Sequence, residues 1–336
     1  MTVPFRALAG TALAAAALTA ATALTGCSAV HTLTAAEKLD RAQAALGDAH
    51  AVSLTLSLHA TAAQLVALDT TSGDGPSDDK AAAALLRDGT LTLRLSAPGP
   101  IKEADMRKEH VAVSFAAAGG QVAELRLAGG HLYAHASLTQ TEKVADIVSP
   151  GTGAKLDAAI TSGWMPSALT QLAAGDWIDV RSTQLTGALD RALRTADAQQ
   201  KASAGKIASL MSVLRGDLTI RDAGTDNGRD HLIVSAPARK VVQDVLSKLG
   251  PLEGLGSFDT AKLADVPDRT VSVDMWLTGG HLAAMQVDLA ALTGTTGIGT
   301  VPLRVDIDDH AAPVTVPQDA KTFDVDTLLT AFGTSN

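Results

Sequence analysis

Residues 125–138 read LRLAGGHLYAHASL, and the same Leu-x-Gly-Gly-His-Leu core returns in residues 275–289, MWLTGGHLAAMQVDL. In each stretch two alternating segments flank a Gly-Gly pair, and glycine accepts the positive φ that a two-residue hairpin turn requires. Both stretches are therefore predicted to form antiparallel hairpins. The shared core is short, so either a duplicated strand unit or a common kind of hairpin explains it.

Alternation with a period of two extends over much of the chain and predicts half-buried strands. Residues 52–59, VSLTLSLH, place Leu54, Leu56 and Leu58 on one face and polar side chains on the other. Residues 90–97 repeat the pattern, with Leu91, Leu93 and Leu95 on one face. Further strands are expected at 111–117, 122–128, 131–137, 176–182, 216–222, 229–235, 269–278, 281–289 and 301–308, with a hairpin turn at Asn227-Gly228.

Helices are expected between groups of strands. Thr34 and Glu37 have the spacing of a capping box, which predicts a helix from there to about Leu46. Short helices are expected over 140–173, a longer helical stretch over 185–214, and a loop over 70–80. The pattern predicts an α+β fold, in which a large curved antiparallel β-sheet, a half-barrel, wraps around several helices.

The N-terminus has the form of a secretory signal. Arg6 is its only charged side chain, residues 7–24 are apolar and uncharged, and Cys27 is the single cysteine of the chain. The apolar stretch also approaches the length of about 18 residues at which a spanning helix is conceivable. A lone cysteine excludes an internal disulfide and a cysteine metal cluster, and leaves a catalytic thiol or an anchor.

Leu24-Thr25-Gly26-Cys27 resembles the lipobox of bacterial lipoproteins. The resemblance implies that the chain is cut before Cys27 and that this cysteine carries acyl chains, which would anchor the protein in a membrane. It implies a signal peptide at 1–26, a lipidated cysteine with a short tether at 27–33, and a single domain at 34–336. The expected location is the extracytoplasmic face of the cell membrane.

Composition and motifs argue against several other functions. The chain has 27 basic and 36 acidic residues and a net charge of −9, so no nucleic-acid partner is expected. Ser203 and Lys206 have a nucleophile spacing, but its companion motifs are missing. No catalytic residue, no cofactor and no enzymatic activity are predicted.

Two groups of residues contain possible metal ligands, but their spacing does not favour a site. His131 and His135 would lie about 13 Å apart on a strand, at ~3.3 Å per residue, too far for one ion. Asp306, Asp308, Asp309 and His310 lack the spacing and the bidentate glutamate of a calcium loop, and a solvated strand end is the expected alternative. No metal site is predicted.

The order of elements resembles the LppX/LprG-type lipoproteins of actinobacteria, relatives of the LolA/LolB half-barrel carriers. Leu132-Tyr133, the Gly-x-Trp-x-x-Val motif at 175–180 and the Pro-Val-Thr-Val-Pro close at 313–317 carry the resemblance. It implies a hydrophobic cavity that binds or carries a lipid, lipoglycan or other amphiphile. The alternating strands offer candidate lining residues Leu54, Leu56, Leu58, Leu91, Leu93 and Leu95. Trp177 and Trp276 are expected to pack in the core, and lining the cavity is the alternative for both. A filled core is the alternative to a cavity. A scaffolding lipoprotein that binds an envelope protein is the alternative function.

Overall fold

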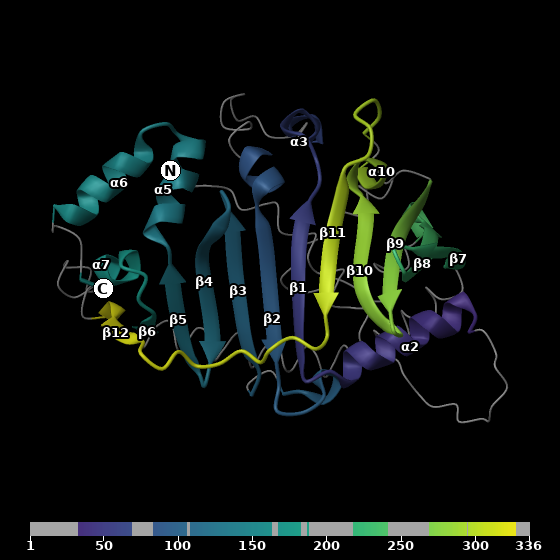
Figure 1. Cartoon of the computed structure of the whole chain (residues 1–336), viewed down its shortest axis with the longest axis horizontal. Coiled ribbons are helices and arrows are strands. Elements are labelled where there is room, and N and C mark those ends of the chain that lie inside the picture. The colour runs from purple at the N-terminus through teal and green to yellow at the C-terminus, as the bar shows by residue number, and fades with distance from the viewer. Residues whose placement is uncertain are drawn as a thin grey trace.

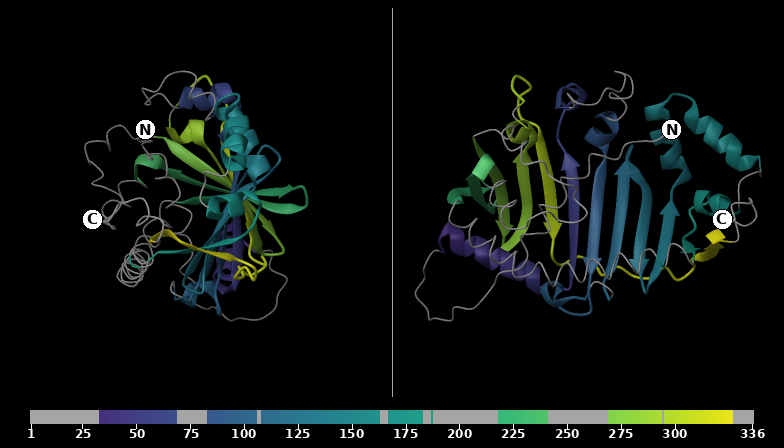
Figure 2. Two further views of the ribbon diagram at one scale, coloured as in Figure 1. Left: turned by 90° about the vertical axis from the view of Figure 1, so that its left-hand side faces the viewer. Right: turned by 180° about the vertical axis from the view of Figure 1, so that it is seen from behind.

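A computed structural model of the chain describes residues 33–68, 83–105, 108–162, 167–182, 187, 218–240, 269–293 and 295–326. Twelve strands form one sheet in the order β12-β6-β5-β4-β3-β2-β1-β11-β10-β9-β8-β7 (Figure 1). Every neighbouring pair is antiparallel except β12 and β6. The sheet is open, because β12 and β7 stand at opposite ends of the strand order. It is also twisted, since its two ends run in different directions when it is seen along its length (Figure 2).

The strands are β1 (Ala51–Leu58), β2 (Thr90–Ser96), β3 (His110–Ala117), β4 (Gly120–Ala128), β5 (His131–Ala136), β6 (Ile178–Arg181), β7 (Thr219–Asp226), β8 (Arg229–Pro237), β9 (Thr270–Thr278), β10 (His281–Asp288), β11 (Pro302–Asp308) and β12 (Lys321–Asp324). Eleven of them lie where alternation predicts strands. The exception is β12, which is short and pairs in parallel with β6. The α+β fold with a large antiparallel sheet is confirmed.

The helices are α2 (Ala35–Asp48), α3 (Ala62–Leu68), α5 (Leu138–Val148), α6 (Thr152–Thr161), α7 (Ser167–Ala173) and α10 (Leu289–Thr293), with a short 3-10 helix at Ile101–Glu103. In Figure 1, α5, α6 and α7 lie at the β5–β6 end of the sheet, and α3 and α10 lie at its upper edge. None of the helices in the described ranges is both long and apolar enough to cross a membrane.

Both Gly-Gly turns have the backbone that the sequence predicts. Gly129 and Gly130 have φ of 60° and 79°, and Gly279 and Gly280 have φ of 60° and 88°. A side chain is strained at such angles, which is why the turns require glycine. The two hairpins, β4–β5 and β9–β10, lie in opposite halves of the sheet.

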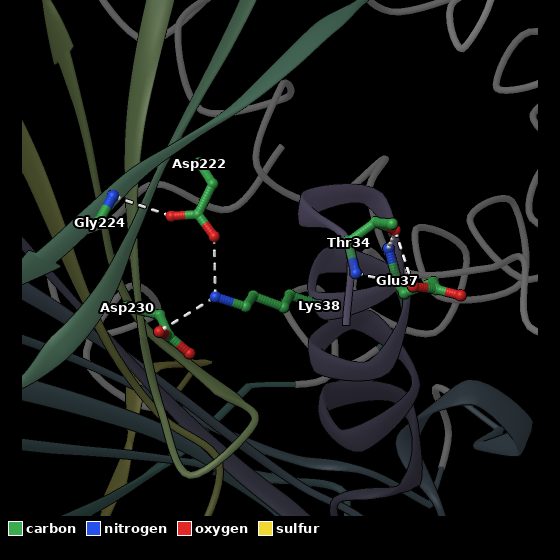
Figure 3. Close-up of polar contacts among 6 residues, drawn as sticks. All are labelled: Thr34, Glu37, Lys38, Asp222, Gly224 and Asp230. Carbon is green, nitrogen blue, oxygen red and sulfur yellow. Dashed lines mark hydrogen bonds and ion pairs between the residues drawn. The ribbon is translucent and has the colours of Figure 1, made fainter. Parts of the chain in front are cut away.

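Helix α2 begins with the predicted capping box. Thr34 Oγ1 accepts a hydrogen bond from the Glu37 backbone at 3.3 Å, and the Thr34 backbone donates to Glu37 Oε2 at 2.7 Å (Figure 3). The helix continues to Asp48, slightly beyond its expected end. Its Lys38 Nζ contacts Asp222 Oδ2 at 2.9 Å and Asp230 Oδ1 at 3.2 Å, and so fastens α2 to the β7–β8 hairpin.

One hydrophobic core lies between α2 and the sheet. Leu39, Ala42 and Leu46 of the helix are buried against strand residues that include Leu232 and Leu277. Each buried leucine stabilises the fold by about 1.5–3 kcal/mol relative to exposure. This core therefore lies over the β7–β11 half of the sheet and its junction with β1.

The segment between β11 and β12 crosses the lower ends of several strands before it reaches β6 (Figure 1). Val314 at its centre is 3% exposed, and its backbone N–H donates to Ser96 Oγ at 3.0 Å. His110 Nδ1 lies 2.9 Å from the Val314 carbonyl, and Arg126 Nη1 donates to the Thr315 carbonyl at 3.1 Å. These side-chain contacts hold an extended segment that has no strand partner of its own.

Candidate functional site

A continuous apolar face runs across the sheet. Residues paired directly across neighbouring antiparallel strands place their side chains on the same face. Leu54 pairs with Ile307 on one side and with Leu93 on the other. The row continues from Leu93 through Val113 and Leu125 to β5 and β6. A parallel row includes Met275, Met285, Val305, Leu56, Leu91 and Phe115.

Burial along this face is uneven. Over β7–β11 the side chains belong to the core beneath α2, where Leu232 is fully buried and Leu277 is 2% exposed. On β3 and β4, Val113 is 37% exposed and its direct partner Leu125 is 49% exposed. Contiguous large apolar side chains that remain accessible mark an interaction surface more often than a random surface position does. This β2–β5 part of the apolar face is the candidate site.

The six leucines predicted to line a cavity, at positions 54, 56, 58, 91, 93 and 95, do share this face, and all of them are partly buried. Two surface pockets, of about 300 and 480 Å³, lie beside α2, and Leu125 lines neither of them. Because Leu125 is 49% exposed, the apolar face around it is an accessible surface of the sheet.

The two tryptophans lie on the opposite face, and their assignment to the leucine-lined site is wrong. Trp276 pairs with His231 and Ala284, one residue out of phase with Met275 of the apolar row. Trp177 precedes Ile178, whose partner Ala134 belongs to the apolar face, and its ring lies against Arg126 and His135 of the other face. Because side chains alternate along a strand, neither ring reaches the leucines.

Around Trp177 the polar face carries a network of fixed charges. Arg126 Cζ lies 4.2 Å from the Trp177 ring centre, and Arg126 Nε donates to Glu124 Oε1 at 2.7 Å. Arg94 also contacts Glu124, and Gln121 donates to it at 3.0 Å. Burial alone would raise the pKa of Glu124, but hydrogen bonds from Arg126 and Gln121 and the charges of both arginines outweigh it and lower that pKa.

Around Trp276 the partners differ. Its indole N–H donates to Asp226 Oδ2 at 2.8 Å, and the His231 ring stacks on it at 5.1 Å with an interplanar angle of 3°. His231 Nε2 in turn lies 2.7 Å from Asp274 Oδ1. Arg304 Cζ lies 4.9 Å from the indole centre. Trp276 is 7% exposed and is a packed part of this face.

Each Gly-Gly hairpin places its histidine beside a buried aspartate. His131 Nδ1 lies 3.2 Å from Asp179 Oδ1, and His281 Nδ1 lies 2.6 Å from Asp309 Oδ2. The side chains of both aspartates are less than a tenth exposed. The ring of His135, four residues after His131, packs against Trp177 with ring centres 5.0 Å apart.

The acidic cluster at the end of β11 is a solvated strand end, as expected, at Asp308 and His310, which are exposed, and at the half-exposed Asp306, but the expectation is wrong for Asp309. Asp309 is 8% exposed and faces two histidines, His281 and His310. Asp306 pairs with Arg304 at 2.9 Å, and Asp308 Oδ1 accepts the His310 backbone N–H at 3.0 Å. Asp309 alone of this group is buried, because the turn after β11 directs it inward.

Several predictions fall outside the described residues. They are the signal peptide, Cys27 and most of the tether, the loop at 70–80, nearly all of the helical stretch at 185–214, and the Ser203–Lys206 pair.

Comparisons with known proteins find few matches. No family model matches the chain, and no curated protein sequence matches it. Among solved structures, the chain matches the crystal structure of the Mycobacterium tuberculosis lipoprotein LppX, with 10% sequence identity and a TM-score of 0.31. The match covers 83% of this chain and 96% of that one. A likeness of this level does not carry a function from one chain to the other.

Proposed function

We propose that this protein is a membrane-anchored extracytoplasmic lipoprotein that binds or carries a lipid or other amphiphile on the apolar face of its sheet, without catalysis. The accessible pair Val113 and Leu125, at the centre of a continuous aliphatic face, carries the proposal. An acyl chain laid over such side chains gains about 0.8 kcal/mol for each methylene removed from water. A chain of ordinary length thus supplies enough energy for binding without a polar contact.

The anchor belongs to the same proposal. The lipobox-like segment that ends in Cys27 supports a signal peptide at 1–26 and a tether to residue 33. A cysteine that carries two or three acyl chains exceeds the two-signal threshold for stable membrane attachment. The domain would then bind its ligand close to the membrane from which the ligand comes.

The test is organic extraction of the full-length protein, followed by mass spectrometry of the released lipid. Acyl chains on Cys27 are covalently attached and stay with the protein, whereas a bound lipid is released. We expect stoichiometric lipid from the wild type and at least a fivefold loss in Leu125→Asp, because a carboxylate on the face must be desolvated when an acyl chain covers it.

Val148→Asp is the matched control, because Val148 is 52% exposed on α5. This variant is expected to retain its lipid. A wild-type protein that releases no lipid, or equal loss from both variants, contradicts the proposal. Capture of a defined envelope protein by a lipid-free chain would instead support the scaffolding alternative.

A further inference from the structure

A pocket of about 480 Å³ lies below the sheet between the C-terminal end of α2, the start of β1 and the turn after β11. Its lining includes three histidines, His50, His281 and His310, together with Asp309. The apolar rows of the sheet contribute none of these four residues. The chemistry of this pocket is therefore different from that of the proposed lipid surface.

Three of these side chains can reach one point. The ligand atoms offered by His281, Asp309 and His310 all lie within 4.8 Å of one another. His281 Nδ1 is 2.6 Å from Asp309 Oδ2, and His310 Nε2 is 3.8 Å from Asp309 Oδ1. Ligands at about 2.0–2.2 Å from one ion lie roughly 3–4 Å apart, so shifts below about 1 Å would bring all three onto it.

The β4–β5 hairpin, called the sister hairpin below, has an equivalent histidine–aspartate pair and shows which positive charge is missing beside Asp309. There, His131 lies beside Asp179, and Arg181 Nε donates to the second carboxylate oxygen at 3.0 Å. The buried charge of Asp179 is thus balanced by a permanent cation. At Asp309, no arginine or lysine contact is found among the described residues, and the carboxylate oxygen that His281 does not contact has His310 Nε2 at 3.8 Å. A buried carboxylate needs such a partner.

The surroundings also favour a positive charge. Asp48 and Ala49, at the C-terminal end of α2, line the same pocket, and the carbonyl end of a helix carries a partial negative charge. Lys102 pairs with Asp48 at 2.6 Å, so that carboxylate already has its own cation. The helix end and Asp309 together leave a negative potential in the pocket.

We propose that His281, Asp309 and His310 bind one divalent first-row transition-metal ion, with water completing its coordination. Two imidazoles and one carboxylate suit zinc, copper, nickel or iron, whereas calcium and magnesium prefer oxygen ligands alone. His310 is 77% exposed at its side chain and can move onto the ion, while Asp309 is held in place by its burial. The site is independent of the proposed lipid binding.

The test is a Zn²⁺ titration of the untagged full-length protein by calorimetry and against a chromophoric chelator. We expect one ion per chain with a dissociation constant at or below the micromolar range. His310→Ala should weaken binding at least tenfold, as should His281→Ala. His131→Ala, in the sister hairpin, is the matched control and should leave the affinity unchanged.

His310→Ala is the decisive variant, because a largely exposed side chain can be removed without unfolding the chain. Replacement of Zn²⁺ by Co²⁺ adds an absorption band that the wild type and His131→Ala should show and that His310→Ala should lose. The proposal is overturned if the wild type binds no Zn²⁺ at millimolar free ion, or if His310→Ala binds as tightly as the wild type.

Discussion

The β4–β5 and β9–β10 hairpins share a turn sequence, a turn backbone and a histidine beside a buried aspartate, but they differ in the cations that balance their acidic groups. In the β2–β6 half, Glu124 is bound by two arginines and Asp179 by Arg181. In the β7–β11 half, the matched carboxylate Asp274 is bound by His231, and Asp309 by His281.

The difference between the halves is chemical. An arginine is charged at every pH at which the protein is folded, and it has no lone pair for a metal. A histidine gains its charge only on protonation, and its neutral ring can bind a metal ion. Equivalent carboxylates in the two halves of the sheet therefore have different partners. In one half the partner is an arginine of permanent charge, and in the other it is a histidine that can change its charge or bind a metal ion.

The largest expected effect tests whether the arginine-bound carboxylate stabilises more than the histidine-bound one. The side chain of Glu124 is 5% exposed, whereas that of Asp274 is 34% exposed. Glu124→Ala should lower the free energy of unfolding by about 3 kcal/mol, because it leaves two arginines without their shared partner. Asp274→Ala should lower it by less than about 1 kcal/mol. Urea denaturation followed by circular dichroism measures both, and equal losses would remove the distinction between the halves.

The same pair gives a pH dependence with a defined sign. The pKa of Glu124 is lowered in the folded state, so its stabilising contribution is complete above the usual carboxyl range of about pH 4–5. It is lost as the pH falls through the lowered folded pKa. The stability gap between wild type and Glu124→Ala should therefore narrow below about pH 4. A gap that stays constant on acidification would contradict the lowered pKa.

The two turns should differ in their tolerance of alanine. Gly130 and Gly280 both have positive φ, which costs an alanine about 1–2 kcal/mol. A Cβ at Gly280 would also lie 3.0 Å from Arg41 Nε, whereas one at Gly130 would meet nothing within 4 Å. Thermal unfolding should show a loss of about 2 kcal/mol for Gly280→Ala and about 1 kcal/mol for Gly130→Ala. The reverse order would show that the contact between Arg41 of α2 and the Gly280 turn does not restrict a side chain at that position.

The two Trp→Phe variants should also differ in stability. The larger loss is again expected in the β7–β11 half, but the difference between the variants is smaller than for the turns. Trp276→Phe removes the donor to Asp226 from a buried ring and should cost about 1 kcal/mol. Trp177→Phe keeps an aromatic ring beneath Arg126 and should cost only a few tenths of that, near 0.3 kcal/mol. Chemical denaturation of the two variants gives the comparison. A larger loss from Trp177→Phe would mean that the Arg126 contact depends on the indole itself.

The smallest expected loss of stability comes from removing the ion pairs between α2 and the β7–β8 hairpin. Lys38 contacts two carboxylates that are 40% and 46% exposed, so Lys38→Met should cost about 0.5 kcal/mol. The difference should vanish near 1 M salt, because screening removes the contribution of exposed ion pairs. Arg87→Met, at the exposed pair with Asp88 outside this contact, is the control and should show no larger effect. Persistence of the Lys38 effect at high salt would indicate packing rather than charge.

The features that depend on neighbouring residues in the chain could be predicted from the sequence. Eleven strands, the capping box at Thr34 and both Gly-Gly turns follow from alternation, spacing and backbone preference. The side of the sheet taken by Trp276 could also have been found, since Val273, Met275 and Leu277 alternate and leave the indole on the other face.

The remaining features depend on contacts between distant segments. The burial of Asp309 requires the neighbouring hairpin, which brings His281 beside it, and no local pattern indicates that contact. Strand β12 has four residues and a parallel partner far away in the chain, so alternation could not reveal it. The leucines of the proposed lipid surface could be placed on one face from their alternation, but the accessibility of Leu125 depends on which helices cover the sheet.

The position of β1 in the sheet has a consequence for how the chain can fold during synthesis. Strand β1 is made first, yet one of its two edges is paired with β11, nearly the last strand to be made. Until β11 arrives, that edge presents unpaired N–H and C=O groups, which is the usual template for aggregation. Pairing over such a sequence separation is also slow. A nascent chain would therefore need the unpaired edge of β1 shielded until translation is nearly complete.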